Sequence, residues 1–141
     1  MKKVILLILF IPLGVLALLF LLAPVLNDGA AKRTAEELAD LPLPERSELV
    51  EIAYKAGKLT GSGNGMQYFG AILLKSELSP EELSEFYSGE AKVKKQTGSN
   101  IEPIEHGDLA FQSEVGEDGY YIVYSWGRND GFFHEIDLRG H

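Results

Sequence analysis

An uninterrupted apolar run near the N-terminus constrains this chain more than any other feature. Residues 4–26 read VILLILFIPLGVLALLFLLAPVL and contain no charged side chain. At about 1.5 Å per residue, a helix of this length measures about 34 Å, against a bilayer hydrocarbon core of ~30 Å. Such a helix is apolar on every face, unlike an amphipathic helix that lies on a membrane surface. The run therefore predicts a transmembrane helix over residues 4–26, with the lipid bilayer as its partner.

The residues that flank this run predict its orientation. Lys2 and Lys3 precede it and favour a cytoplasmic location for residues 1–3, so the rest of the chain is expected outside the cell membrane. A cleaved signal peptide is the alternative, because Gly29 and Ala31 match the small residues that precede a cleavage site. Cleavage there would leave a secreted soluble domain. The run exceeds the ~7–15 apolar residues of a signal peptide, which favours a retained signal anchor.

The charge of the remaining chain limits its partners. Lys2 and Lys3 are two of 13 basic residues, so residues 27–141 contain 11 basic side chains against 21 acidic ones. An acidic domain repels the phosphate backbone of nucleic acid, which is therefore not expected as a partner. The chain has no cysteine, which excludes disulfides, thiolate catalysis and the lipidated cysteine of a lipoprotein.

Residues 27–46 are predicted to connect the membrane helix to a folded domain. The Asn-Asp-Gly sequence at 27–29 favours a turn and is expected to end the membrane helix. A capping box that begins at Thr34 predicts a short second helix, interpreted as a juxtamembrane stalk outside the core. The Leu-Pro-Leu-Pro sequence at 41–44 then predicts a stiff, extended linker, because proline disfavours helix in the residue before it.

Residues 47–141 are predicted to form one extracytoplasmic α+β domain. The first segment, 48–55, fits both a strand and a helix by its spacing of apolar residues, and its brevity favours a strand. A glycine-rich loop follows at 61–65. The near-continuous apolar run at 68–75 predicts a central strand that is covered on both faces.

The clearest local signal in the domain is a helix start at residue 79. Ser79 can cap the helix, Pro80 fits its first turn, and Glu82 completes a capping box. Leu78 and Leu83 occupy the positions of a hydrophobic staple. The single apolar stripe of this short helix predicts that it lies across a sheet.

The C-terminal third is predicted to be an antiparallel meander. Alternating residues indicate strands at 109–115, 120–126 and 132–138, separated by turns at 117–119 and 127–131. In the middle strand, alternate side chains point to opposite faces, and most of its aromatic residues are expected in the core. One or two further strands are expected between residues 92 and 105, where three lysines suit a solvated sheet edge.

Two surface features are the candidate binding residues. The loop contains Gly61, Gly63, Asn64 and Gly65, and glycines can bring backbone amides close to an anion, although the spacing of a phosphate-binding motif is missing. Near the end of the middle meander strand, Trp126 and Arg128 form a candidate contact patch. Together they give the residues of a possible binding loop or contact patch: Gly61, Gly63, Asn64, Gly65, Trp126 and Arg128.

No pattern for catalysis or metal binding is evident. His106, His134 and His141 are not spaced as metal ligands, and no carboxylate-rich metal loop occurs. Close acidic pairs such as Glu102 and Glu105 are expected by chance in so acidic a chain, and the nucleophile motifs of hydrolases are missing. No catalytic, cofactor-binding or metal-binding residue is therefore assigned, and no cofactor is expected.

The sequence GSGNGMQYFGAILLKSELSPEELSEFY, residues 61–87, resembles a segment of small membrane-anchored bacterial proteins without an assigned activity. The order of strand, capped helix and antiparallel sheet is also similar to small lipoprotein-like domains, from which this chain departs because it has no cysteine to lipidate. Neither resemblance implies an activity or a functional residue.

These inferences predict an α+β fold: an N-terminal transmembrane helix, then a small antiparallel sheet with one helix packed on it. The expected function is that of a single-pass membrane protein, a non-catalytic binding or accessory module with a protein partner at the membrane surface. Sensing of a small ligand or an envelope polymer is the alternative. Tethering favours either function, because it raises the effective concentration near membrane partners.

Overall fold

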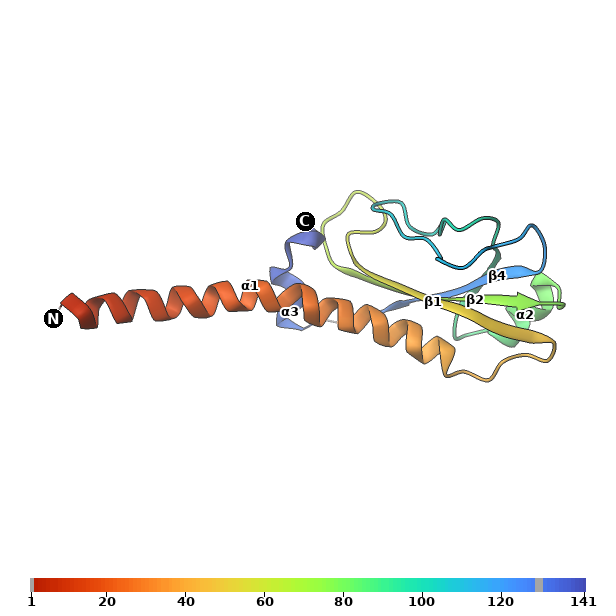
Figure 1. Ribbon diagram of the computed structural model, residues 1–141, viewed down its shortest axis with the longest axis horizontal. Coiled ribbons are helices and arrows are strands. Elements are labelled where there is room, and N and C mark those ends of the chain that lie inside the picture. The colour runs from red at the N-terminus through yellow and green to blue at the C-terminus, as the bar shows by residue number, and fades with distance from the viewer. Residues whose placement is uncertain (1, 129–130) are drawn as a thin grey trace.

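The computed structural model describes residues 2–128 and 131–141 and shows an α+β fold (Figure 1). Met1, Asn129 and Asp130 lie outside the described residues, so part of the predicted turn at 127–131 does as well. In chain order, the elements are α1 (Lys2–Ala39), β1 (Ser47–Gly57), β2 (Gln67–Ser76), α2 (Pro80–Phe86), β3 (Lys92–Lys95), β4 (Tyr120–Gly127), α3 (Phe132–Ile136) and the 3₁₀ turn η1 (Leu138–Gly140).

The described strands form one antiparallel sheet in the order β1-β2-β4-β3. Strand β2 lies between β1 and β4 and is buried at nearly every position, which confirms the prediction of a central strand at 68–75. Residues 48–55 belong to β1, so the strand interpretation of that segment is confirmed. Strand β3 forms an edge with its three lysines exposed, as expected of a solvated edge.

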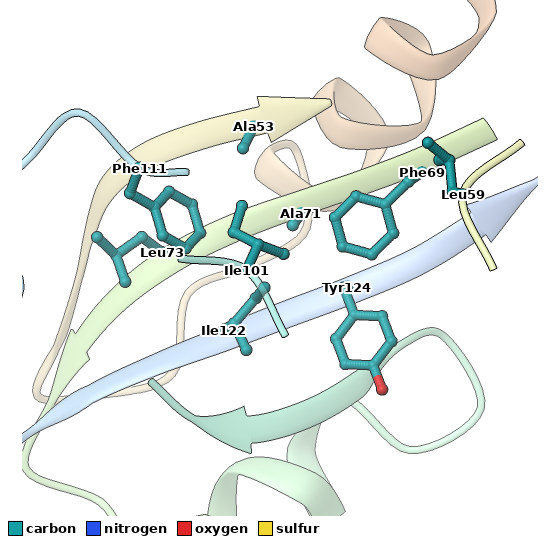
Figure 2. Close-up of a cluster of buried hydrophobic side chains, with 9 residues drawn as sticks. All are labelled: Ala53, Leu59, Phe69, Ala71, Leu73, Ile101, Phe111, Ile122 and Tyr124. Carbon is teal, nitrogen blue, oxygen red and sulfur yellow. The ribbon is translucent and has the colours of Figure 1, made fainter. Parts of the chain in front are cut away.

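One face of the sheet carries the larger hydrophobic cluster (Figure 2). Alternate residues of β2 and β4 point into it, and Phe69 and Tyr124 lie at its centre with ring centroids 5.7 Å apart. No helix covers this cluster in the described chain; the long irregular segment between β3 and β4 does, with Ile101 and Phe111. The buried members are Ala53, Leu59, Phe69, Ala71, Leu73, Ile101, Phe111, Ile122 and Tyr124.

The opposite face is covered by helices. Leu38 of α1 and Leu83 of α2 pack there against Ile72 and Val123 of the central strands. The capping box of α2 is present: Ser79 Oγ accepts from the Glu82 amide at 3.2 Å, and Glu82 Oε2 accepts from the Ser79 amide at 2.8 Å. The predicted capped helix on a sheet is thus confirmed.

The two faces of β4 also agree with the alternation of its sequence. Ile122 and Tyr124 lie in the first cluster, whereas Tyr121 and Val123 lie in the second. Period-two alternation with large side chains on both faces is the pattern of a strand buried on both sides.

Helix α1 is a single helix with two different halves. Its first half extends away from the sheet, and its second half lies along the strands (Figure 1). In the second half, Ala31 and Ala35 are fully buried, and they belong to a stripe at intervals of three and four residues that runs from Ala23 to Leu38. This spacing places the small residues on one side of the helix, where they permit a close approach to the sheet.

The prediction that the first helix ends at residues 27–29 is wrong, because α1 continues without interruption to Ala39. The interpretation of the short helix capped at Thr34 as a stalk outside the core is also wrong, since Ala35 and Leu38 are buried against the sheet. Considered by themselves, the polar and turn-forming residues of this segment favour a turn. In the folded protein, packing against the sheet stabilises them in a helix.

Two of the three strands predicted for the C-terminal third are not formed. Residues 109–115 are irregular, with only an isolated bridge between Asn100 and Ala110, although Phe111 is buried as the alternation suggested. Residues 132–138 form α3 and the start of η1 instead of a strand. At 109–115 the alternation marked the buried Phe111 but did not distinguish a strand from an irregular segment that packs on the sheet. At 132–138 it did not mark buried positions either, because Phe132 and Leu138 are exposed.

Candidate functional site

The most extensive polar cluster in the described chain joins α1 to the C-terminal segment. We call it the helix clasp. Its members come from α1, from the start of β2 and from the last residues of the chain: Asn27, Asp28, Tyr68, His134, Asp137 and Arg139.

A buried carboxylate lies at the centre of the helix clasp. Asp137 is only 1% exposed, and both its oxygens accept from Arg139, at 3.0 Å from Nε and 2.8 Å from Nη2. Burial alone would raise the pKa of Asp137, but the hydrogen bonds from Arg139 and Asn27 outweigh this and lower it to about 2. The hydrogen bond to Asp137 in turn raises the pKa of Arg139 above its ordinary value. Both groups are therefore charged at neutral pH.

Arg139 also reaches α1 directly. Its Nη1 donates to Asp28 Oδ1 at 2.8 Å, and its Nη2 donates to the main-chain carbonyl of Pro24 at 3.1 Å. The planar guanidinium has enough donors for these groups and for Asp137 at the same time, which a lysine ammonium would not match in geometry. One side chain thus connects two turns of α1 to the C-terminal segment.

The fully buried Asn27 provides the second connection. Its Nδ2 donates to Asp137 Oδ2 and to the carbonyl of Phe133, both at 2.9 Å. Its Oδ1 accepts from the hydroxyl of Tyr68 at 3.0 Å, and that hydroxyl lies 3.2 Å from His134 Nδ1. The amide therefore links α1, β2 and α3 through hydrogen bonds within a buried site, where such bonds matter most.

Main-chain contacts extend the helix clasp to the sheet. The carbonyl of Arg139 accepts from the amide of Lys58 at 2.8 Å, just after β1. The carbonyl of Gly140 accepts from the amide of Gly65, just before β2. A Cβ at Gly140 would lie within 3.0 Å of the main chain and side chain of Met66, so this close approach requires glycine. The donors and acceptors of the helix clasp bond to one another. This arrangement suits a structural role, in which the helix clasp holds α1 against the sheet.

The predicted glycine loop lies beside the helix clasp. Gly61 donates its amide to Glu105 Oε2 at 2.8 Å, and its carbonyl lies 2.7 Å from His106 Nε2. Gly61 and Gly65 have φ angles of 72° and 140°, which explains glycine at these two positions. Gly63, Asn64 and Gly65 line a depression together with His134.

The predicted contact patch occupies a different part of the surface. Trp126 is half-buried and packs edge-on against Phe69, with ring centroids 5.0 Å apart, and it lines a depression with Gly89 and Lys92. Arg128 is exposed. Trp126 therefore contributes to the hydrophobic cluster as well as to the surface, and it lies in a depression separate from that of the glycine loop.

A second polar site lies at the other end of the sheet, where β1 begins and β2 ends. This distal depression is open and lined by Arg46, Ser47, Glu48, Lys75, Ser76, Glu77, Asp118 and Gly119. The hydroxyls of Ser47 and Ser76 lie 2.7 Å apart across the two strands. Arg46 has a φ of 59°, which a residue other than glycine rarely adopts, and its Nη1 is 4.0 Å from Glu77. Charges of both signs line this opening.

In residues 2–128 and 131–141, no group of three or more acidic or histidine side chains is arranged to hold a metal ion. His106 is beside the glycine loop, and His134 is in the helix clasp. The structure therefore separates these two histidines between different local environments.

The sequence patterns did not predict the helix clasp. A usable signal was present: Ala23, Asn27, Ala31 and Ala35 recur at intervals of four residues from the end of the apolar run onward, which indicates a packed helix face. The buried Asp137 had no such signal, because its burial depends on contacts with α1 that are 110 residues away in the chain.

Comparisons of the chain with protein families, with curated proteins and with solved structures find no match.

Proposed function

We propose that the protein is a single-pass membrane protein in which α1 spans the bilayer and holds a non-catalytic binding module at the membrane surface. The observation that carries this proposal is that the first half of α1 is apolar and exposed, whereas its second half packs against the sheet. From Phe10 onward, α1 is long and apolar enough to cross a membrane. The described apolar side chains of its first half, among them Leu13, Leu18 and Leu21, are exposed rather than packed in a core.

The docked half of α1 supports retention of the helix. The predicted alternative, cleavage after Ala31, would remove Asn27 and Ala30, both buried against the rest of the chain. It would also remove Asp28 and the Pro24 carbonyl, two of the partners of Arg139. A signal peptide that is discarded has no reason to contribute buried contacts to the mature fold, so these contacts favour a signal anchor.

The distal depression supports a binding role. It opens at the end of the sheet opposite the first half of α1 (Figure 1), where a partner would approach without obstruction by the bilayer. Arg46 and Lys75, together with Glu77, present both donors and acceptors there. This lining suits a polar surface of another protein, since paired charges give specificity at interfaces. Lys2 and Lys3 favour a cytoplasmic N-terminus and hence an outward-facing domain.

Membrane anchoring and orientation are testable together because the chain has no cysteine. We expect the protein to stay in membranes after alkaline extraction, with its N-terminal segment uncleaved by mass spectrometry. A Glu77→Cys variant should react with a membrane-impermeant maleimide on intact cells. A matched Lys3→Cys variant should react only after the membrane is opened. A soluble mature chain that begins at Lys32 would contradict the anchor, and the reverse labelling pattern would contradict the orientation.

The binding role needs a separate test. A photo-crosslinking amino acid in place of Lys75, in the distal depression, should capture one stoichiometric protein partner from intact cells. The same amino acid in place of the exposed Glu114 provides the matched control, because Glu114 does not line that depression. Equal capture at both positions, or none at either, would contradict a partner at the distal depression.

A further inference from the structure

The two most exposed large apolar side chains in the described chain outside α1 lie close together in sequence. Phe132 is 60% exposed and Leu138 is 75% exposed, and both belong to the segment of α3 and η1. Phe132 contacts Phe133 edge-on, with ring centroids 5.6 Å apart. Single exposed apolar residues are ordinary on a protein surface, so the position of this pair in the molecule decides its meaning.

This segment lies where the apolar surface of α1 ends. Arg139, next to Leu138, is bonded to the carbonyl of Pro24 and to Asp28, and Asn27 is bonded to the carbonyl of Phe133. Val25 and Leu26 of α1, in the same turn, are themselves exposed. Figure 1 shows α3 and the C-terminal turn beside α1, at the end of the sheet nearest the N-terminus. The exposed apolar surface of the segment therefore adjoins that of the proposed span.

From this continuity we infer that the C-terminal segment is a membrane-interface element. Phe132 and Leu138 insert into the interfacial layer of the bilayer that α1 crosses, an inference that rests on the proposed membrane span. Aromatic and aliphatic side chains beside polar groups suit this layer, where one end of the element is apolar and the other is wet. The polar helix clasp adjoins the C-terminal segment and stays within the protein.

A second copy of the chain is a poorer match for this surface. Stable protein interfaces bury about 800 Å² on each partner, far more than two side chains provide. Any protein that covered Phe132 and Leu138 would also meet the adjoining apolar surface of α1, which the bilayer already covers in the proposed arrangement. Lipid covers both surfaces at once, so it is the occupant that we assign.

The inference predicts different depths for three positions. Each of the variants Leu16→Cys, Glu135→Cys and Leu43→Cys receives an environment-sensitive fluorophore in the full-length protein, reconstituted in phosphatidylcholine vesicles. Glu135 is exposed on α3 between the two apolar residues, and Leu43 follows the far end of α1, about 20 Å beyond Leu26 along the helix. Lipids that carry a nitroxide should quench the fluorophores at residues 16 and 135 but not at residue 43.

A pair of double variants tests the role of the apolar side chains. In the Glu135→Cys background, Phe132→Ser with Leu138→Ser should lower the quenching at least about twofold. The matched control, Leu43→Ser with Phe86→Ser, removes two other exposed apolar residues and should leave it unchanged.

The outcomes separate the two hypotheses. If residue 16 is quenched but residue 135 is not, the interface inference is wrong and the membrane span remains. If residue 16 is not quenched, the span fails and the inference fails with it. If the fluorophore at residue 135 is shielded from water-soluble quencher, is not quenched by lipid and crosslinks to a second copy, the surface is a protein interface and the inference is overturned.

Discussion

Gly70, in the middle of β2, lies directly against the main chain of Ala35 in α1. A Cβ built on Gly70 would be 2.9 Å from the Cα of Ala35 and 2.6 Å from the carbonyl carbon of Thr34. Both neighbours are backbone atoms of a helix and cannot move independently. The absence of a side chain at Gly70 therefore sets how closely α1 approaches the sheet.

We predict that Gly70→Ala lowers the free energy of unfolding by about 2–3 kcal/mol, because it forces α1 away from β2. The matched control is Gly63→Ala, where a Cβ would meet open space and the backbone has no left-handed φ. Urea unfolding in detergent, followed by circular dichroism, measures both variants. Equal stability of the two would show that the close approach is not required.

Removal of the clasp arginine should be costly. In Arg139→Ala, the buried carboxylate of Asp137 loses its charged partner, and we expect a loss of about 2 kcal/mol or more in unfolding free energy. Lys95→Ala is the matched control, because Lys95 and Asp118 form an equally short 2.8 Å pair that is exposed. That variant should lose less than about 1 kcal/mol. Similar losses in the two variants would contradict a structural role for the helix clasp.

Stability should depend on pH through Asp137. Its pKa is lowered to about 2 in the folded protein, below the ordinary value of 3.8. A carboxylate of lowered pKa stabilises the fold above its unfolded-state pKa, and this contribution, about 2 kcal/mol, is lost as the pH falls from about 4 to 2. Unfolding free energies of the wild type and Asp137→Asn should therefore converge over this interval. A difference that stays constant between pH 5 and 2 would contradict the lowered pKa.

Two buried tyrosines should respond oppositely to loss of their hydroxyls. Among the described residues, the hydroxyl of Tyr87 is buried without a hydrogen-bond partner, and burial raises its pKa. Tyr87→Phe should therefore raise the unfolding free energy by about 1 kcal/mol, because it removes an unsatisfied polar group. Tyr68→Phe removes the bonds to Asn27 and His134 and should lower it by about 1 kcal/mol. Thermal unfolding of the two variants distinguishes these signs, and stabilisation by Tyr68→Phe would be incompatible with the helix clasp.

The sequence predicted those elements that depend on residues close together in the chain. The capping box at Ser79 and Glu82 specified α2, and the apolar run at 68–75 specified the central strand, because neighbouring residues alone decide those features. The α+β class, with α2 on an antiparallel sheet, followed from them, whereas the packing of α1 on the same face did not.

Features that depend on distant contacts were not predictable in the same way. The Asn-Asp-Gly sequence at 27–29 indicates a turn locally, yet Asn27 is held in α1 by bonds to Phe133 and Asp137 at the other end of the chain. Likewise, the alternation at 132–138 suggested a strand, whereas α3 and η1 form where Arg139 binds α1. In both cases, the partner that decides the local structure lies more than 100 residues away.

Helix α1 passes without interruption from its exposed half to its docked half, and Pro24 lies within it where the two halves meet. The helix clasp and the close approach at Gly70 hold two separate turns of the docked half, so rotation of the sheet about this half, or bending away from it, would break one of these contacts. If the first half spans a bilayer, tilt or axial rotation of the span reaches the sheet through Pro24, where the helix lacks one main-chain hydrogen bond. Events within the membrane and the orientation of the distal depression would then be mechanically coupled.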